Sequence, residues 1–279
     1  MKIAIVTGAS SGMGRETARQ IADRYAGIEE IWIVARRSQR LRELEEQLPV
    51  RVRCFAADIT CPQQRESLRE ALRACQPNVK FLVNAAGFGK IGRVGELDEE
   101  TECAMVRLNC EALCAVTHMV LPYMSPNSRI LQFASAAAFL PQPGFAIYAA
   151  SKSFVLSYSR ALNEELKNRN ICVTAVCPGP VRTEFFDIAE TTGRIPFYKQ
   201  MVMADCAQVV RQALRDCAMG RPVSVYGYSM QALRLACRLI PHSLLLNAYT
   251  WCNRCLPMLS PGTGRRRGLR ARRGGRRIS

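Results

Sequence analysis

The chain has 279 residues, of which 48% are hydrophobic, and a formal net charge of +16. This length and apolar content allow one full-sized core, since α/β domains of about 250 residues are often single. No apolar run reaches the roughly 18 to 20 residues that a membrane-spanning helix needs, so an integral membrane protein is not expected. Thirteen Cys without regular spacing, and no leader before the apolar run at Ile3, predict a reducing, cytoplasmic setting.

The positive charge is concentrated in the last part of the chain. Residues 221–279 hold twelve of the 39 Lys and Arg residues and none of the 23 Asp and Glu residues. Residues 1–220 therefore carry 27 basic and 23 acidic groups. The body of the protein is predicted to be nearly neutral, and the basicity belongs to the C-terminus.

The N-terminus predicts a strand, a glycine-rich turn and a helix in succession. Residues 2–7 form a short apolar run, residues 7–14 read Thr-Gly-Ala-Ser-Ser-Gly-Met-Gly, and residues 15–25 have a helical pattern. Glycines let the backbone approach a ligand closely, and a helix N-terminus offers N–H groups to a phosphate. The place of this turn, after the first strand and before the first helix, favours a dinucleotide site. The alternative is a turn that uses glycine only for its conformation.

The end of the second strand indicates which dinucleotide is bound. Residues 31–35 form the next apolar run, and Arg36 and Arg37 follow it. An acidic residue at this place binds the ribose hydroxyls of NAD(H), whereas an Arg accommodates the 2′-phosphate of NADP(H). The sequence therefore favours NADP(H) over NAD(H). The alternative is that Arg36 and Arg37 only form a solvated entry to the next helix.

The rest of residues 1–227 alternates strands and helices. Strands are predicted at 51–56, 81–83, 128–134, 171–176 and 223–226, with helices at 98–124, 147–166 and 204–218 among those between them. This alternation implies a single Rossmann-like α/β domain with a doubly wound parallel sheet of about seven strands. A less regular segment to Met203 is predicted to cover the substrate, with the apolar residues Phe185, Phe186, Ile188, Ile195 and Phe197.

The helix predicted at 147–166 carries a phenol and an ammonium on one face. Tyr148 and Lys152 are four residues apart, and Ser135 precedes Tyr148 by thirteen residues. A free Tyr titrates at about 10, and a cation beside its oxygen lowers that pKa. Such a Tyr can pass a proton to or from a substrate oxygen. An isolated pair would more often be ordinary helix surface, so its meaning depends on the motifs around it.

Taken together, these motifs resemble those of the short-chain dehydrogenase/reductase family over about residues 2–227. The family order and spacing are found in Thr7-Gly-x-x-x-Gly-x-Gly14, Asp58, Asn84-Ala-Ala-Gly87, Asn109, Ser135, Tyr148-x-x-x-Lys152 and Pro178-Gly179. The resemblance implies an NADP(H)-dependent interconversion of a carbonyl and an alcohol. It also implies a homodimer or homotetramer, because family members commonly pair through the helices that here hold Asn109 and Tyr148.

The resemblance implies roles for particular residues. Tyr148 would be the general acid/base, Lys152 would lower its pKa and bind the nicotinamide ribose, and Ser135 would polarise the carbonyl. Asn109 would hold a water in a proton relay to Lys152. Around the cofactor, Gly8, Gly12 and Gly14 would contact the diphosphate, Arg36 the 2′-phosphate, Asp58 the adenine, Asn84 the ribose and Thr183 the carboxamide; the other implied contacts are Ser10, Ser11, Met13, Ile59, Ala85, Gly87, Pro178, Gly179 and Val181.

One position departs from the pattern of the family. Many relatives that prefer NADP(H) have a basic residue inside the glycine-rich turn, where this chain has Ser10 and Ser11. Arg36, with Arg37 beside it, is then left as the main predicted contact of the 2′-phosphate.

Residues 228–261 form an apolar extension with a helical pattern that ends at Pro241, and residues 262–279 form an Arg-rich tail that is predicted to be disordered. The extension would suit packing on the body, a subunit contact, or peripheral contact of residues 228–279 with an anionic membrane. The tail lacks the interleaved aromatic residues of a base-stacking surface, so nucleic acid is not an expected partner. Cys252 and Cys255 have no second pair beside them, and no metal site is expected.

Two classes of function remain at this point. The first is an oxidoreductase of a lipophilic ketone or secondary alcohol, such as a steroid or ketolipid. The second is a non-catalytic NADP(H)-binding or membrane-associated scaffold on the same fold. The complete set of Ser135, Asn109, Tyr148 and Lys152 favours the enzyme, because a binding protein does not need all four.

Overall fold

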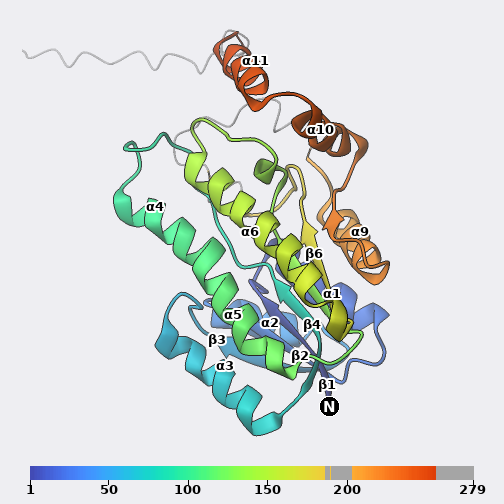
Figure 1. The fold of residues 1–279 in the computed structure, drawn as a ribbon. Helices are drawn as coiled ribbons and strands as arrows, with labels where there is room; N and C mark the ends of the chain where they lie inside the picture. The colour runs from blue at the N-terminus through green and yellow to red at the C-terminus, as the bar shows by residue number, and fades with distance from the viewer. Residues whose placement is uncertain (186–188, 190–202, 256–279) are drawn as a thin grey trace, which may run out of the picture.

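A seven-stranded parallel sheet forms the centre of the protein (Figure 1). The computed structural model describes residues 1–185, 189 and 203–255. The strand order is β3-β2-β1-β4-β5-β6-β7, and every paired neighbour is parallel. The predicted doubly wound sheet is confirmed. Its strands are β1 (Lys2–Thr7), β2 (Glu30–Ala35), β3 (Arg51–Ala56), β4 (Asn78–Asn84), β5 (Arg129–Phe133), β6 (Cys172–Val176) and β7 (Val223–Ser224).

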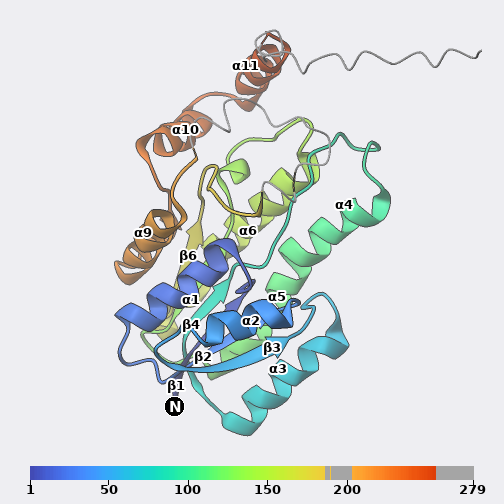
Figure 2. The same cartoon turned by 180° about the vertical axis from the view of Figure 1, so that it is seen from behind.

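Helices cover both faces of this sheet (Figures 1 and 2). On one face, α1, α2 and α9 bury residues such as Ile21, Leu41 and Val210 in a shared core. On the other face, α3, α5 and α6 bury Leu72, Val116 and others in a second core. The bounds of these helices are α1 (Gly12–Arg24), α2 (Ser38–Glu45), α3 (Pro62–Cys75), α5 (Leu113–Val120), α6 (Ala146–Glu165) and α9 (Cys206–Ala218).

The fourth strand is longer than its apolar run predicts. Phe81 and its neighbours form the predicted core of the strand, but β4 begins three residues earlier. The charged residue Lys80 interrupts the apolar run, so a hydrophobicity pattern does not predict the first three residues of the strand. Its Nζ reaches the sheet rim and donates to Ser125 Oγ at 2.6 Å and to Pro126 O at 3.0 Å. A charged side chain can therefore lie within a strand because its ammonium group has partners outside the core.

A long helical stretch, Glu99–Tyr123, combines α4 (Glu99–Val106), a π-helical turn η1 (Arg107–Ala112), α5 and the short η2 (Leu121–Tyr123). It is the one helix of the described chain that is long and apolar enough to span a bilayer, with a mean hydropathy of 1.3. Half of its apolar window is buried inside the protein. Val116 and Val120 contribute to the core on the sheet, as expected of a core helix of a globular domain.

The C-terminal extension forms two further helices, α10 (Tyr228–Leu239) and α11 (His242–Cys255). The predicted helix end before Pro241 is confirmed. Both helices lie at the end of the molecule opposite the N-terminus, and α11 projects from the body (Figures 1 and 2). The tail at 262–279 and the predicted substrate-covering residues Phe186, Ile188, Ile195 and Phe197 lie outside the described residues.

Candidate active site

The predicted site residues converge on the carboxyl edge of the sheet, although they come from eight separate stretches of sequence, six that follow strands and two that lie in the helical elements η1 and α6. Parallel strands end at the same edge, and doubly wound folds bind ligands in the crevice where the strand order reverses. Here the reversal lies between β1 and β4. The residues follow β1 (Gly8, Ser10, Ser11, Gly12, Met13, Gly14), β2 (Arg36), β3 (Asp58, Ile59), β4 (Asn84, Ala85, Gly87), β5 (Ser135) and β6 (Pro178, Gly179, Val181, Thr183).

The glycine-rich turn packs directly on the backbone that follows β4. Gly8 has a φ of +70°, and a Cβ there would lie 2.6 Å from the backbone N of Ala86. A Cβ on Gly14 would lie 2.4 Å from the carbonyl oxygen of Gly8. Neither position accepts a side chain, because real Cβ atoms do not approach backbone so closely. The glycines therefore allow a tight turn that brings the start of α1 to the crevice.

The start of α1 is suited to an anion. The N-cap residue Ser11 is extended, and its side chain makes no capping hydrogen bond to the helix. The first N–H groups of a helix are left without partners inside the helix, and the helix dipole favours negative charge there. The turn thus fits a dinucleotide diphosphate by its shape and by its donors.

Arg37 lies over this turn, whereas Arg36 points elsewhere. Arg37 donates to Ser11 Oγ at 2.7 Å and to Ser10 Oγ at 3.1 Å. Arg36 is largely exposed and pairs with Asp58 at 4.0 Å. Of the two, Arg37 is the guanidinium placed beside the serines that stand where relatives carry a basic residue. The sequence analysis named Arg36 as the main contact, because the directions of two adjacent side chains cannot be read from the sequence.

Asp58 and Asn84, two further polar residues predicted to contact the cofactor, have internal partners. Asp58 accepts from Thr60 N at 2.9 Å and Thr60 Oγ1 at 2.7 Å. Partial burial works to raise the pKa of Asp58, but the hydrogen bonds from Thr60 and the charge of Arg36 outweigh it and lower the pKa. Asn84 is buried and donates to Thr117 Oγ1 at 3.0 Å. The amide nitrogen of Asn84 is thus held in the layer between the sheet and α5, whereas its Oδ1 atom has no hydrogen-bond partner among the described residues. The predicted contact of Asn84 on the ribose side stays a prediction.

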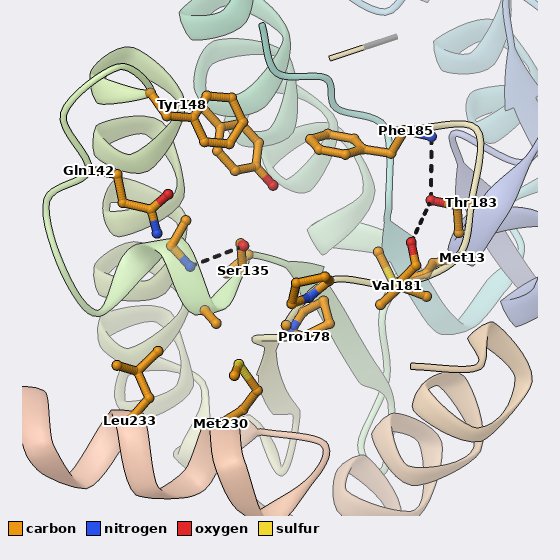
Figure 3. A pocket seen from close by; sticks show the side chains of 16 residues that line it. Met13, Ser135, Gln142, Tyr148, Pro178, Val181, Thr183, Phe185, Met230 and Leu233 are labelled. Atoms are coloured by element: carbon orange, nitrogen blue, oxygen red, sulfur yellow. Dashed lines mark hydrogen bonds between the residues drawn. The ribbon is translucent and has the colours of Figure 1, made fainter. Parts of the chain in front are cut away.

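Ser135 lies where β5 ends, and its hydroxyl is positioned by the backbone. Its Oγ accepts from Ala137 N at 3.1 Å, which occupies one lone pair of the oxygen. The hydroxyl proton is then available to donate into the cavity. Figure 3 shows Ser135 and the oxygen of Tyr148 facing the same space. Ser135 can therefore polarise a carbonyl oxygen held there.

Tyr148 is buried at the start of α6, between two aromatic rings. Phe145 stacks on it with ring centroids 4.3 Å apart, and Phe185 packs at 5.4 Å. Burial raises the pKa of Tyr148 to about 12, although a hydrogen bond with Ser135 acts to lower it. The prediction of a lowered pKa is thus wrong for this arrangement. Lys152 Nζ lies 5.7 Å from the centroid of the phenol ring and bonds elsewhere.

Lys152 is buried and donates to the carbonyl oxygen of Phe133 at 2.8 Å. Burial lowers its pKa to about 8, while the thiols of Cys110 and Cys177 act to raise it. A Cβ on Gly87 would lie 3.2 Å from Lys152 Nζ and 2.8 Å from Asn109 Oδ1. Lys152 and Asn109 therefore meet at the backbone of Gly87, where a side chain would displace the Asn109 amide or the Lys152 ammonium group.

Asn109 is fully buried within the π-helical turn η1. Its amide accepts from Phe88 N at 3.1 Å and donates to Phe88 O and Ser151 Oγ, both at 2.9 Å. Single π-helical turns inside longer helices are frequent at functional sites. Here the turn places the Asn109 amide between the segment after β4 and the helix that carries Tyr148 and Lys152.

A cavity of about 240 Å³ lies in front of Ser135 and Tyr148 (Figure 3). The loop after β6 forms one wall, and α10 forms another through Met230 and Leu233. Met230 packs so closely on Gly179 that a Cβ there would lie 2.7 Å from its sulfur. The extension beyond β7 thus completes the cavity, and of the alternatives open from the sequence, packing of α10 on the body is confirmed.

Sequence reasoning missed Gln142, which also lines the cavity. Within the described chain, its Oε1 atom is buried and has no hydrogen-bond partner. Buried amide oxygens normally have partners, so Gln142 is placed to receive a hydrogen bond from a bound molecule. No sequence signal singles out this Gln between two prolines. Among the described residues, no group of three or more metal-binding side chains is found.

Comparisons with known proteins indicate the family of this chain. The family model for short chain dehydrogenase matches residues 2–192. The sulfoacetaldehyde reductase 2 of Chromohalobacter salexigens is 36% identical over 189 residues, covering 66% of this chain and 74% of that protein. A short-chain dehydrogenase from Sphingobium yanoikuyae, solved in complex with NADPH, is 25% identical with a TM-score of 0.70, covering 95% and 98% of the two chains. A short chain dehydrogenase/reductase from Burkholderia phymatum, solved with NAD, has a TM-score of 0.74 at 22% identity, covering 88% and 95%.

The chain belongs to the short-chain dehydrogenase/reductase family, as its motifs indicate. It is an NAD(P)-dependent oxidoreductase that acts on CH–OH and C=O groups. The two solved neighbours hold different nicotinamide cofactors, so the preference for NADP(H) stays a prediction.

Proposed function

We propose that the protein is an NADP(H)-dependent reductase of a lipophilic ketone. The observation that carries this proposal is the cavity in which Ser135 and Tyr148 stand opposite apolar walls that include Met230 and Leu233. Ser135 and Tyr148 can act on a carbonyl oxygen, and the apolar walls can bury the apolar groups of the same molecule. The reaction class is that of the family, and the substrate class is our inference.

Tyr148 supplies the proton in this mechanism. With a pKa raised to about 12, its phenol is protonated at neutral pH, which is the form that reduction of a carbonyl requires. Ser135 donates a hydrogen bond to the same substrate oxygen and stabilises the negative charge that develops there. When bound, the nicotinamide supplies the hydride that adds to the carbonyl carbon. The carbonyl oxygen takes the proton of Tyr148, and the product is a secondary alcohol.

Lys152 and Asn109 would return a proton to Tyr148. The Lys152 pKa, lowered to about 8, lets the amine exchange protons near neutral pH. Asn109 is fixed by three hydrogen bonds and lies beside the ammonium at Gly87. The family role of Asn109, which holds a water of a proton relay, is consistent with this position. Lys152 would also bind the nicotinamide ribose.

The proposed preference for NADP(H) rests on three arginines that come after β2. Arg36, Arg37 and Arg40 follow β2 or lie in the first turn of α2, and Ala35 rather than an acid ends the strand. Arg37 already contacts both serines of the turn. A 2′-phosphate at this place would gain charge-assisted hydrogen bonds, whereas the free hydroxyl of NAD(H) would gain little.

Assembly as a homodimer or homotetramer stays a proposal that rests on the family.

A second candidate function is a non-catalytic NADP(H)-binding protein. Consumption of NADPH with a panel of ketosteroids, 3-ketolipids and quinones separates the candidates. Turnover of at least one lipophilic ketone, with weak activity on small ketones, is expected. Tight NADPH binding without turnover of any ketone would support the binding protein instead, and turnover of small polar aldehydes alone would refute the lipophilic substrate.

A further inference from the structure

Helix α10 presents three different surfaces. Met230 and Leu233 line the substrate cavity, and Cys237, on the same side of the helix, is buried. Arg234 and Arg238 stand one turn apart and line a groove between α10 and α9. The helix therefore has an inner apolar side that packs on the body and a basic side whose two arginines are exposed.

The third surface is apolar and exposed. Tyr228, Leu235 and Leu239 are 91%, 57% and 71% exposed. Their spacing of seven and four residues puts them on one side of a helix. In the described part of the chain, this side has no partner that covers it. A scattered exposed Leu is ordinary, but an exposed stripe along a whole helix indicates an interaction surface.

Helix α11 also exposes large apolar side chains. Leu244 and Trp251 of α11 lie seven residues apart and are 59% and 67% exposed. Ile240, between the two helices, is also exposed. We call Tyr228, Leu235, Leu239, Ile240, Leu244 and Trp251 the α10–α11 apolar face.

The charge around this face selects its partner. Residues 221–279 contain twelve Arg and no Asp or Glu. A symmetric contact between two copies would bring two such segments together, with no acid in either segment to offset the repulsion. An anionic lipid surface instead offers phosphates to Arg and an apolar layer to Leu and Trp. A protein partner could match one of these properties, but a membrane interface matches both along the whole length of the segment.

We propose that the α10–α11 apolar face docks this cytoplasmic protein peripherally on the surface of an anionic phospholipid membrane. The inner side of α10 is a wall of the substrate cavity, so docking would hold the cavity next to the lipid. Membrane docking itself does not rest on the proposed reductase function. The two can therefore fail separately, since one is read from vesicle binding and the other from NADPH consumption.

Vesicle co-sedimentation of the full-length protein tests the proposal. We expect strong binding to vesicles that mix phosphatidylcholine with phosphatidylglycerol, and weak binding to phosphatidylcholine alone. The double variant Leu235→Ser/Leu239→Ser should have an affinity for the mixed vesicles at least about tenfold lower than that of the wild type, because neither position can then bury an apolar side chain in the lipid. For Arg234→Gln/Arg238→Gln, the affinity for the mixed vesicles should fall about fivefold for each charge removed. Added salt should weaken the vesicle binding of the wild type.

A matched control uses apolar residues exposed elsewhere. Val94→Ser/Met219→Ser removes two such side chains that do not belong to the α10–α11 apolar face, and its vesicle binding should equal that of the wild type. NADPH affinity, measured by fluorescence, confirms that each variant is folded; none of the substituted residues contacts Ser135, Tyr148 or Lys152.

Three results would overturn the proposal. The first is equal vesicle binding by the wild type and the Leu235→Ser/Leu239→Ser variant, with binding abolished by salt, which would assign the binding to arginines alone. The second is no binding of the wild type to mixed vesicles. The third is a Leu variant that changes from oligomer to monomer in analytical ultracentrifugation while it still binds vesicles, which would make the face a subunit contact.

Discussion

Arg37 and Glu184 form an ion pair of 3.0 Å that joins the end of β2 to the segment after β6. Arg40 pairs with the same carboxylate at 3.1 Å. Arg37 and Arg40 are cations proposed to bind the 2′-phosphate. Phe185, which follows Glu184 in the chain, packs on Tyr148. The carboxylate thus neutralises the phosphate site and connects it to the wall of the substrate cavity.

Replacement of Arg37 by Ala should raise the KM for NADPH by about tenfold or more, because a charge-assisted hydrogen bond to the phosphate is lost. The KM for NADH should change little. Steady-state kinetics with both cofactors measures this. Arg36→Ala is the matched control, and its effect should be smaller, since Arg36 pairs with Asp58. Arg36→Asp, in contrast, should still weaken NADPH binding through the charge it adds. A larger effect of Arg36→Ala than of Arg37→Ala would contradict the assignment.

Glu184→Gln should tighten NADPH binding by about two- to fivefold, which is the range expected for loss of an exposed competing ion pair. The carboxylate and the 2′-phosphate would compete for Arg37 and Arg40, and the amide removes that competition. NADH affinity should stay unchanged. Titration of cofactor fluorescence measures both affinities. Glu66→Gln, which breaks exposed ion pairs on α3, serves as control. Equal gains for NADH and NADPH would show that Glu184 does not compete with the phosphate.

Tyr148→Phe should lower kcat by about 10²- to 10⁴-fold, the range typical of a lost general acid. NADPH affinity should be nearly unchanged, because the ring and its stacking on Phe145 remain. Single-turnover measurements with a ketone substrate test this. Tyr158→Phe, on the same helix, should keep full activity. A Tyr148→Phe enzyme with wild-type kcat would refute the proposed proton donor.

Lys152 should make the stability of the protein depend on pH in a defined direction. Its pKa is about 8 in the folded protein, against 10.5 for an unperturbed lysine side chain. Between these values the unfolded state binds the proton and the folded state does not, so this group makes the free energy of unfolding rise with pH. Buried thiols such as Cys177, with a pKa raised to about 12, act in the opposite direction.

The comparison of wild type with Lys152→Met separates the contribution of Lys152. Urea unfolding should be measured for both proteins from pH 7.5 to 10. As pH rises, the free energy of unfolding of the wild type should increase relative to that of Lys152→Met. The thiols contribute equally to both proteins, so they cancel in this comparison. A difference that stays constant over this range would mean that Lys152 is charged in the folded protein.

Gln142→Leu should reveal the part of the substrate that this amide binds. For ketones that carry a hydroxyl group distant from the carbonyl, kcat/KM should fall about tenfold, because a hydrogen bond in a buried site is lost. Ketones without such a group should react equally well or better, since an unpaired buried oxygen is removed. The ratio of the two kcat/KM values is the measurement. An unchanged ratio would exclude Gln142 as a specificity residue.

The parts of the fold that could be predicted are those with a local signal. Apolar runs such as residues 31–35 located the strands, and the order of motifs located the edge where they end. The sequence favoured Arg36 over Arg37, and the contacts of Arg37 with Ser10 and Ser11 could not be predicted, because they depend on the direction of each side chain from the backbone. Burial of Tyr148 was also missed, since the two rings that cover it come from separate segments. The raised pKa follows from that burial and not from the spacing to Lys152.

The contact between Met230 and Gly179 has a consequence for how relatives of this enzyme can diverge. The groups proposed to transfer the proton all precede β7, whereas one wall of the cavity comes from α10, after the last strand. A change in α10 can therefore alter which molecules fit without disturbing the sheet or the catalytic groups. Gly179 is the exception, because a side chain there would collide with the Met230 side chain and force it to move within the cavity wall. Natural variation in substrate range is thus expected to accumulate in residues 228–240, with position 179 held as glycine.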